Sequence, residues 1–267
     1  MMRYTGNGNT YNYGDIIRLP DKARVIVVSD IHGNYDDFLN YVNMWRKGGK
    51  DTHIVFLGDL IHGLDPKTDG SLDILLDVGK LIYENTFHVL MGNHEWYQIN
   101  DIPIYKNGVN QTEEFKKICT SHGNLMLGLC KDIMKEFKKI AIAPNGLVMA
   151  HAGPSRRMND ILRDMNGLTL SPIYAQSEID EAFEQMVFAR PNDHFGYIEK
   201  DVDQFLENVG GSIMIVGHTP VNGYRVFGKQ IIMDSSFATQ NKYVLSMLTY
   251  EECNTVDDAV KNLIKIE

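Results

Sequence analysis

Five short apolar runs, each followed at once by polar side chains, constrain the fold of this chain more than any other feature. Each run holds four or five residues, all of them apolar or aromatic apart from His88 in the third, which is typical of a strand buried on both faces. The runs lie at 25–28, 54–57, 87–91, 147–150 and 213–216. Helical patterns separate most of them, and this alternation predicts an α/β fold.

Apolar spacing and capping residues predict where several helices lie. The first helix is expected to begin at Asn34 and to end at Gly48, because these residue types favour the two ends of a helix. A second helix is expected to follow Ser71 as its N-cap. Further helical patterns lie in two segments between about 112 and 140, near 177–188 and near 200–209.

The end of the chain has a different pattern. Strand-like segments at 224–227, 230–233 and 243–250 are separated by Gly, Ser and Asn, with no room for helices. Antiparallel pairing is therefore expected there. No linker-like stretch divides the chain, so we predict one domain over 1–267, with a polar N-terminal extension at 1–20 and the functional motifs within 24–235.

Composition excludes several classes of protein. Hydrophobic residues make up 43% and charged residues 23%, which is typical of a globular chain. With 26 Lys and Arg against 35 Asp and Glu, nucleic acid is not an expected partner. The three cysteines show no metal-knuckle or disulfide spacing, the N-terminus is polar, and no run is long enough for a membrane span. We therefore expect a cytoplasmic protein without a membrane partner, of unknown oligomeric state.

Potential metal ligands follow every one of the five predicted strands. Because ligands bind at the carboxyl ends of strands in open α/β sheets, these side chains are expected to converge. Asp30 and His32 are two residues apart, so on an extended segment they point to the same side. The candidate ligands are Asp30, His32, Asp59, Asn93, His151 and His218.

The chemistry of these donors predicts the type of metal. Carboxylate, imidazole and amide ligands together suit manganese, iron or zinc, whereas calcium and magnesium prefer oxygen alone. Six donors exceed the four of a tetrahedral site, and a carboxylate that bridges two ions accounts for the excess. We therefore predict two divalent transition metal ions, with manganese favoured over iron or zinc.

The order of the motifs resembles the calcineurin-like metallophosphoesterase superfamily. The motifs are Asp30-Ile31-His32, Gly58-Asp59, Gly92-Asn93-His94-Glu95, His151-Ala152-Gly153 and Gly217-His218-Thr219-Pro220. The third and the last most resemble the phosphoprotein phosphatase branch, including its small phage and bacterial members. The resemblance covers about residues 24–235. It implies a four-layer α/β/β/α sandwich, in which two mixed sheets are flanked by helices.

The resemblance also implies a role for each candidate ligand. Asp30 and His32 would hold the first ion, and Asp59 would bridge the two. The second ion would be completed by Asn93, His151 and His218.

The resemblance further implies catalytic and phosphate-binding residues. With Asp59 as the bridge, a metal-bridging hydroxide would attack phosphorus while His94, as general acid, protonates the leaving group. Arg190 lies between the fourth and fifth motifs, where the family has a phosphate-binding arginine. Its guanidinium suits phosphate oxygens, so we expect it to bind the substrate phosphate together with Asn93 and His94.

One motif departs from the phosphatase branch. That branch reads Gly-Asp-x-Val-Asp-Arg-Gly, in which the second Asp orients the acid and the Arg holds phosphate. His62 and Gly63 stand at those positions here, and either Asp65 or His62 is left to orient His94. The segment 58–66 is also similar to the Gly-Asp-x-x-x-x-Gly-x-Asp-Pro pattern of phosphodiesterase members. Those members usually end in Gly-His-Thr-His, whereas Pro220 follows the threonine here.

These observations predict a phosphoric ester hydrolase that depends on a dinuclear metal centre. The leading prediction is a phosphomonoesterase, such as a serine/threonine protein phosphatase, whose substrate is a phosphoprotein or a small phosphate ester. A phosphodiesterase or a hydrolase of nucleotides or dinucleoside polyphosphates is the alternative. A catalytically dead binding scaffold is less favoured, because a scaffold has no physical need for six converging ligands.

Overall fold

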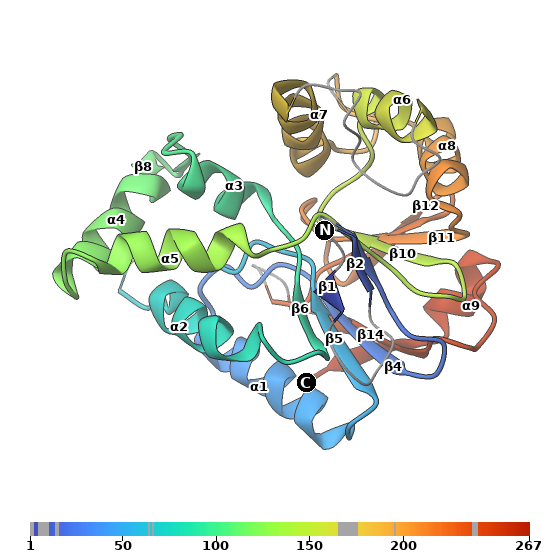
Figure 1. The fold of residues 1–267 in the computed structure, drawn as a ribbon, viewed down its shortest axis with the longest axis horizontal. Coiled ribbons are helices and arrows are strands. Elements are labelled where there is room, and N and C mark those ends of the chain that lie inside the picture. The colour runs from blue at the N-terminus through green and yellow to red at the C-terminus, as the bar shows by residue number, and fades with distance from the viewer. Residues whose placement is uncertain are drawn as a thin grey trace.

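Two large β-sheets pack face to face, and helices cover their outer faces (Figure 1). The computed structural model describes residues 3–4, 11–13, 16–63, 65, 67–164, 176–194, 196–236 and 240–267. Both sheets contain parallel and antiparallel pairs. The predicted sandwich of two mixed sheets flanked by helices is therefore confirmed.

The first sheet has five strands, of which three are parallel neighbours. Its order is β15 (Leu263–Ile266), β14 (Lys242–Leu248), β4 (Arg24–Val28), β5 (Thr52–Phe56) and β6 (Phe87–Val89). Strand β14 runs antiparallel to both β4 and β15. The carboxyl ends of β4, β5 and β6 thus lie at one edge of this sheet.

The second sheet has eight strands. Its order is β1 (Arg3–Tyr4), β2 (Tyr11–Tyr13), β3 (Ile16–Arg18), β9 (Ile140–Ile142), β10 (Leu147–Ala150), β11 (Ile213–Val216), β13 (Gln230–Met233) and β12 (Tyr224–Phe227). Strands β10, β11 and β13 are parallel neighbours, so their carboxyl ends also share an edge.

The alternation of side chains along β4 explains why the layers form. Val25 and Val27 are buried in the cluster between the two sheets, where they meet side chains such as Met149. Ile26 and Val28 point to the other face and pack in the cluster that includes the helices. Because successive side chains of a strand point to opposite faces, a fully apolar strand is stable only between two layers.

The helices fall into groups on the two sides of the sandwich. In Figure 1, α1 and α2 lie along the five-stranded sheet, while α6 and α8 lie beside the eight-stranded one. Helices α4 and α5 pack against α2, and α3 packs against α5 and α7. None of the helices in the described part of the chain is long and apolar enough to cross a membrane. The helices are α1 (Tyr35–Lys47), α2 (Ser71–Leu81), α3 (Asn93–Ile99), α4 (Gln111–Ser121), α5 (Met126–Lys135), α6 (Arg156–Asp164), α7 (Gln176–Phe188), α8 (Glu199–Val209) and α9 (Val256–Val260).

The ends of the first two helices test the capping predictions. Asn34 is the N-cap of α1, since its side chain accepts a hydrogen bond from the backbone of Asp37, and the helix ends at Gly48 as predicted. The prediction for α2 is wrong, because Gly70 is its N-cap and Ser71 is already helical. The Ser71 hydroxyl instead donates to the Asp69 carboxylate.

Strand assignments at both ends of the chain also differ from expectation. Strands β12 and β13 pair antiparallel as predicted, but β14 crosses to the other sheet. Residues 16–18 lie within the predicted polar extension, yet they form β3, whose Ile16 and Ile17 are buried beside β9. Residues 1–2, 5–10 and 14–15 of that extension lie outside the described residues. Helix α6 and strand β9 were not predicted.

Candidate active site

The six predicted metal ligands converge in one buried group, to which both sheets contribute. Asp30 and His32 follow β4, and Asp59 follows β5. Asn93 begins helix α3 just after β6. The other sheet supplies His151 after β10 and His218 after β11.

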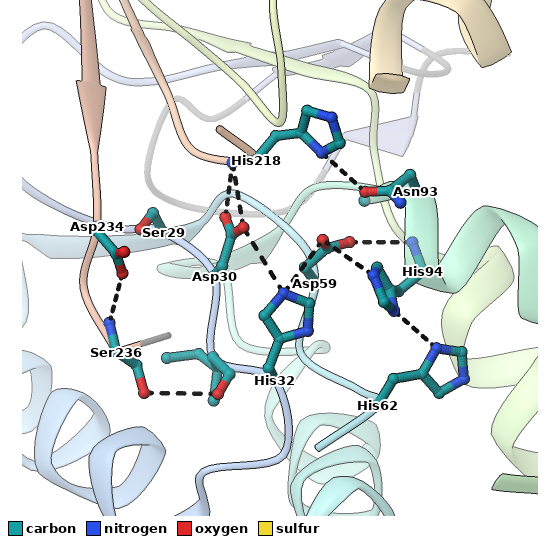
Figure 2. Close-up of polar contacts among 12 residues, drawn as sticks. Ser29, Asp30, His32, Asp59, His62, Asn93, His94, His218, Asp234 and Ser236 are labelled. Carbon is teal, nitrogen blue, oxygen red and sulfur yellow. Dashed lines mark hydrogen bonds and ion pairs between the residues drawn. The ribbon is translucent and has the colours of Figure 1, made fainter. Parts of the chain in front are cut away.

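The Asp59 carboxylate lies at the centre of this group (Figure 2). Its Oδ2 is 3.6 Å from Nε2 of His32 and 3.5 Å from Nε2 of His151. Two sets of donor atoms that lie within 4.8 Å of one another share this residue: His32, Asp59 and His94, and Asp59, His151 and His218. Asp59 is therefore placed where one carboxylate could serve two ions.

Asp30 and Asn93 lie on either side of that centre. The backbone N–H of His218 donates to both carboxylate oxygens of Asp30, at 3.0 and 3.1 Å, and Oδ2 of Asp30 is 3.9 Å from Nε2 of His32. The Asn93 Oδ1 is 3.0 Å from Nε2 of His151 and 3.0 Å from Nδ1 of His218. The predicted ligands of the second ion are thus in mutual contact.

The protonation of two histidine rings tests whether the group fits a metal. Nδ1 of His32 lies 3.2 Å from the Ile61 carbonyl, and Nδ1 of His151 lies 3.1 Å from the Leu57 carbonyl. A carbonyl can only accept, so Nδ1 of each ring carries the proton and Nε2 keeps a lone pair. Burial lowers the pKa of both rings, which favours this neutral form. Each lone pair then faces oxygen acceptors, an unfavourable arrangement that a cation between them would convert into coordination.

The two buried carboxylates lead to the same conclusion. Burial raises the pKa of Asp30, and burial together with the nearby Asp30 charge raises the pKa of Asp59. Ionising both in this setting is costly unless a positive charge lies between them. The donor set therefore fits divalent cations.

The backbone at the site is held in an uncommon conformation. Seven non-glycine residues among those described have positive φ, and four of them lie in or next to this group. The four are His32, Asp59, His62 and His218, with φ values of 48°, 52°, 68° and 61°. Non-glycine residues seldom adopt this region, and when they do so together they often mark a functional site.

Glu95 holds the loop that carries Asp59. Its buried carboxylate accepts hydrogen bonds from the backbone N–H groups of Asp59, Leu60 and Ile61, at 2.8, 2.7 and 3.3 Å. It also accepts from Gly92 at 3.2 Å. Burial raises its pKa to about 7. Glu95 belongs to a recognised motif, but the sequence alone did not indicate this anchoring role.

His94, the expected general acid, lies between the carboxylate centre and His62. Its Nε2 is 3.9 Å from Oδ2 of Asp59, and its Nδ1 is 2.8 Å from Nδ1 of His62. His62 is buried, although a loop histidine is exposed by default. Asp65 is exposed and accepts from the backbone of Lys67, so the geometry favours His62 over Asp65 as the neighbour of His94.

A cavity of about 430 Å³ opens above the ligands. Arg190 lines it, and its Nε donates to Nε2 of His218 at 3.3 Å. Lys106 and Asp234 also line it, and neither was predicted. Asp234 directly follows β13, so the pattern of an apolar run followed by a polar residue could have predicted it. No local sequence pattern indicates Lys106.

Lys106 brings a second cationic side chain to the cavity. It comes from the hairpin of β7 (Tyr105–Lys106) and β8 (Val109–Asn110). Burial lowers its pKa to about 8, while the charges of Asp59 and Asp30 partly oppose that change. Gly63 has no room for a side chain, because a Cβ there would lie 2.8 Å from Cγ of Asp69. An arginine at this position would therefore require Asp69 to move.

Comparison with known proteins identifies the family. The model of the calcineurin-like phosphoesterase family matches residues 23–222. The serine/threonine-protein phosphatase C23G10.1 of Caenorhabditis elegans is 24% identical over 225 residues, which cover 78% of this chain and 46% of that protein. The putative serine/threonine-protein phosphatase C27B7.6 of the same organism is 25% identical over 58% of this chain and 32% of its own length. This chain therefore matches less than half the length of either relative.

Solved structures share the fold. A serine/threonine phosphatase from Saccharomyces cerevisiae, described as similar to human PP5, superposes with a TM-score of 0.62 at 19% identity, over 92% of this chain and 79% of that one. A cold-active protein-tyrosine phosphatase of a Shewanella species gives 0.58 at 18% identity, over 95% and 82%. The family model matches most of the length of this chain, and the chain therefore belongs to the calcineurin-like phosphoesterase family.

Proposed function

We propose that this protein is a metal-dependent phosphoric ester hydrolase that acts on phosphomonoesters. The observation that carries the proposal is the pair of buried donor sets that share Asp59 beneath a cavity lined by Arg190 and Lys106. Such an arrangement combines a site for two cations with positive side chains that suit an anionic substrate.

The six strand-end residues would hold the two ions. Asp30, His32 and Asp59 would bind one ion, and Asp59, Asn93, His151 and His218 the other, with manganese favoured and iron or zinc as alternatives. When bound, the ions would stabilise charge on the phosphate and supply a nucleophile at neutral pH. Burial disfavours protonation of the histidines, and the neighbouring carboxylates disfavour one another's charge, so bound cations would stabilise the ionised carboxylates beside neutral imidazole rings.

Three side chains of this protein would act on the substrate. His94 turns Nε2 toward the cavity, from which it would donate a proton to the oxygen of the leaving group. Arg190 and Lys106 would bind the phosphate oxygens by charge-assisted hydrogen bonds. Asn93, which begins α3, would complete the phosphate site together with His94.

The substrate class is the finer part of the proposal. Two relatives and one structural neighbour are named serine/threonine phosphatases, which favours a phosphoserine or phosphothreonine protein. A second candidate is a phosphodiesterase or dinucleoside-polyphosphate hydrolase, which the glycine at position 63 in place of an arginine favours. Pocket loops decide between such substrates, and residues 165–175 of one of them lie outside the described residues.

A panel of substrates tests the proposal. The purified, manganese-loaded protein is expected to hydrolyse p-nitrophenyl phosphate and a phosphoserine peptide faster than bis-p-nitrophenyl phosphate or a dinucleoside polyphosphate. Preference for the diester or the dinucleotide would support the second candidate. If no ester is cleaved although metal is bound, the protein is a binding scaffold and the proposal is wrong.

A further inference from the structure

His62 and Gln98 form a hydrogen-bonded chain behind His94. Nδ1 of His62 is 2.8 Å from Nδ1 of His94, and its Nε2 is 3.0 Å from Oε1 of Gln98. Both residues are buried, and neither lines the cavity. Figure 2 shows His62 on the side of His94 that faces away from Asp59. His62 can therefore act on the reaction only through His94.

The acceptor in Gln98 sets the direction of the hydrogen bonds. Oε1 of Gln98 can only accept, so Nε2 of His62 must donate to it. Nδ1 of His62 then holds a lone pair and accepts from Nδ1–H of His94. This leaves Nε2 of His94 toward Asp59 and the cavity, at 3.9 Å from Oδ2 of Asp59. These hydrogen bonds thus determine which nitrogen of His94 faces the substrate.

The fold holds the His62 ring firmly in this position. Its backbone N–H donates to Oγ of Ser71 at 2.9 Å, and its ring packs edge-on against Phe115 at 5.9 Å between centroids. Its backbone has a φ of 68°, a conformation that costs free energy for any residue with a side chain. Such strain persists only where surrounding contacts hold it, and here these contacts include the backbone bond to Ser71 as well as those of the imidazole.

We infer that His62 is the positioning residue of His94 and that Gln98 fixes the tautomer of His62. The inference rests on the proposed function, in which His94 is the general acid. A neutral imidazole thereby fills the position that a carboxylate holds in the phosphatase branch. It accepts the hydrogen bond from Nδ1–H of His94, so that when His94 is protonated on both nitrogens its Nε2–H points at the leaving group and carries the proton that is transferred, without another negative charge next to Asp59.

The dependence on the leaving group tests this role. His62→Gly removes the ring without backbone strain, because glycine adopts positive φ readily. On phenyl phosphate, whose leaving group must be protonated, we expect kcat to fall about 100-fold with KM nearly unchanged. On 2,4-dinitrophenyl phosphate, whose leaving group departs as an anion, kcat should fall less than about 5-fold. An equal loss on both substrates would overturn the inference, because a structural defect affects them alike.

Two further variants separate positioning from folding. Asparagine tolerates positive φ and offers an amide oxygen near the position of Nδ1, so His62→Asn should recover most of the loss on phenyl phosphate. Gln98→Met keeps the side-chain volume but removes the acceptor, and should show a weaker form of the same leaving-group dependence. The assigned roles would be contradicted if His62→Asn recovered no activity, or if Gln98→Met kept full activity.

Nitrogen NMR of the histidine rings gives a readout that needs no substrate. In the zinc-loaded protein, we expect Nδ1 of His94 to carry the proton in the wild type and to lose this preference in His62→Gly. A proton on Nε2 of neutral His94 in the wild type would overturn the inferred direction, as would a flipped Gln98 amide. If the wild type cleaves no aryl phosphate, the proposed function fails, while this measurement still decides the positioning role.

Discussion

The floor and the rim of the cavity are built in different ways. We call floor the six predicted metal ligands together with His94, all of which line the cavity except His151 beneath them, and we call rim the side chains of Tyr105, Lys106 and Arg190. The floor follows strand ends of both sheets, and every one of its residues is buried. The rim comes from the hairpin β7–β8 and from the segment between α7 and α8. In many enzymes the residues that carry out the chemistry are held by the scaffold, while the surrounding loops select the substrate.

The contacts that hold the two regions differ accordingly. Four backbone hydrogen bonds to Glu95 hold the segments of the floor at 59–61 and at Gly92, and three floor residues have positive φ. The rim hairpin has two-residue strands, and Tyr105 on it is 67% exposed. Substitutions in the floor should therefore weaken metal binding and lower kcat. Substitutions in the rim should instead change KM and the preference among substrates.

The largest expected effect is that of Asp59→Asn in the floor. An amide oxygen lacks the negative charge that a bridge between two cations needs, so kcat/KM on p-nitrophenyl phosphate with manganese should fall by about 10³-fold or more. Asp65→Asn is the matched control, because Asp65 is an exposed carboxylate in the same loop, and its activity should remain. Turnover retained in Asp59→Asn would place the metal centre elsewhere.

Replacing the rim cations should have an intermediate effect. Lys106→Ala and Arg190→Ala would each remove a proposed charge-assisted hydrogen bond to phosphate, which is worth about 1.5–3 kcal/mol, so KM should rise roughly 10- to 100-fold. Steady-state kinetics should show a smaller change in kcat. Lys135→Ala, on an exposed lysine paired with Asp132, serves as the control. If a variant instead lowered kcat at constant KM, the replaced residue would act in the chemical step and not in substrate binding, which would contradict this prediction.

The last expected effect concerns stability and not catalysis, at a site outside both regions. His53 and His88 stack between β5 and β6, with 3.0 Å from Nδ1 of His53 to Nε2 of His88. Burial lowers their pKa values to about 4 and about 3. The unfolded chain therefore binds more protons below about pH 6.5, so this contribution to stability is complete above that pH and is lost as pH falls toward 4.

Denaturant unfolding with a chelator present measures this loss. Between pH 6.5 and 4.5 each histidine should lower the free energy of unfolding by up to about 1.4 kcal/mol per pH unit. The double variant His53→Phe, His88→Phe keeps two rings but removes the titration, so its stability should depend less on pH than that of the wild type. Equal slopes in the two proteins would contradict the assignment. The floor histidines are present in both proteins, so their contribution cancels.

The floor could be predicted from the sequence, because its signal is local. An apolar run followed by Asp, Asn or His places a donor at a strand end whatever the rest of the chain does, and Asp234 after β13 obeys the same pattern. The layers could be predicted for a similar reason, since continuous apolar strands need cover on both faces.

Features that depend on distant contacts could not be predicted in this way. The environment of His62 is set by His94 and Gln98, which lie more than thirty residues further along the chain. Strand β3 has only Ile16 and Ile17 as an apolar signal, and its pairing with β9 makes it a strand. Lys106 lines the cavity only because the hairpin folds over it. Ser71 resembles a cap, but Asp69 engages its hydroxyl.

Metal binding tests the central claim, the shared role of Asp59, most directly. The wild-type chain, saturated with manganese and freed of excess ion, should contain two ions per chain by elemental analysis, with the electron paramagnetic resonance spectrum of a spin-coupled pair. Asp59→Asn should retain at most one ion and lose the coupling, while Asp65→Asn keeps both. A single uncoupled ion in the wild type, or an intact coupled pair in Asp59→Asn, would contradict this account.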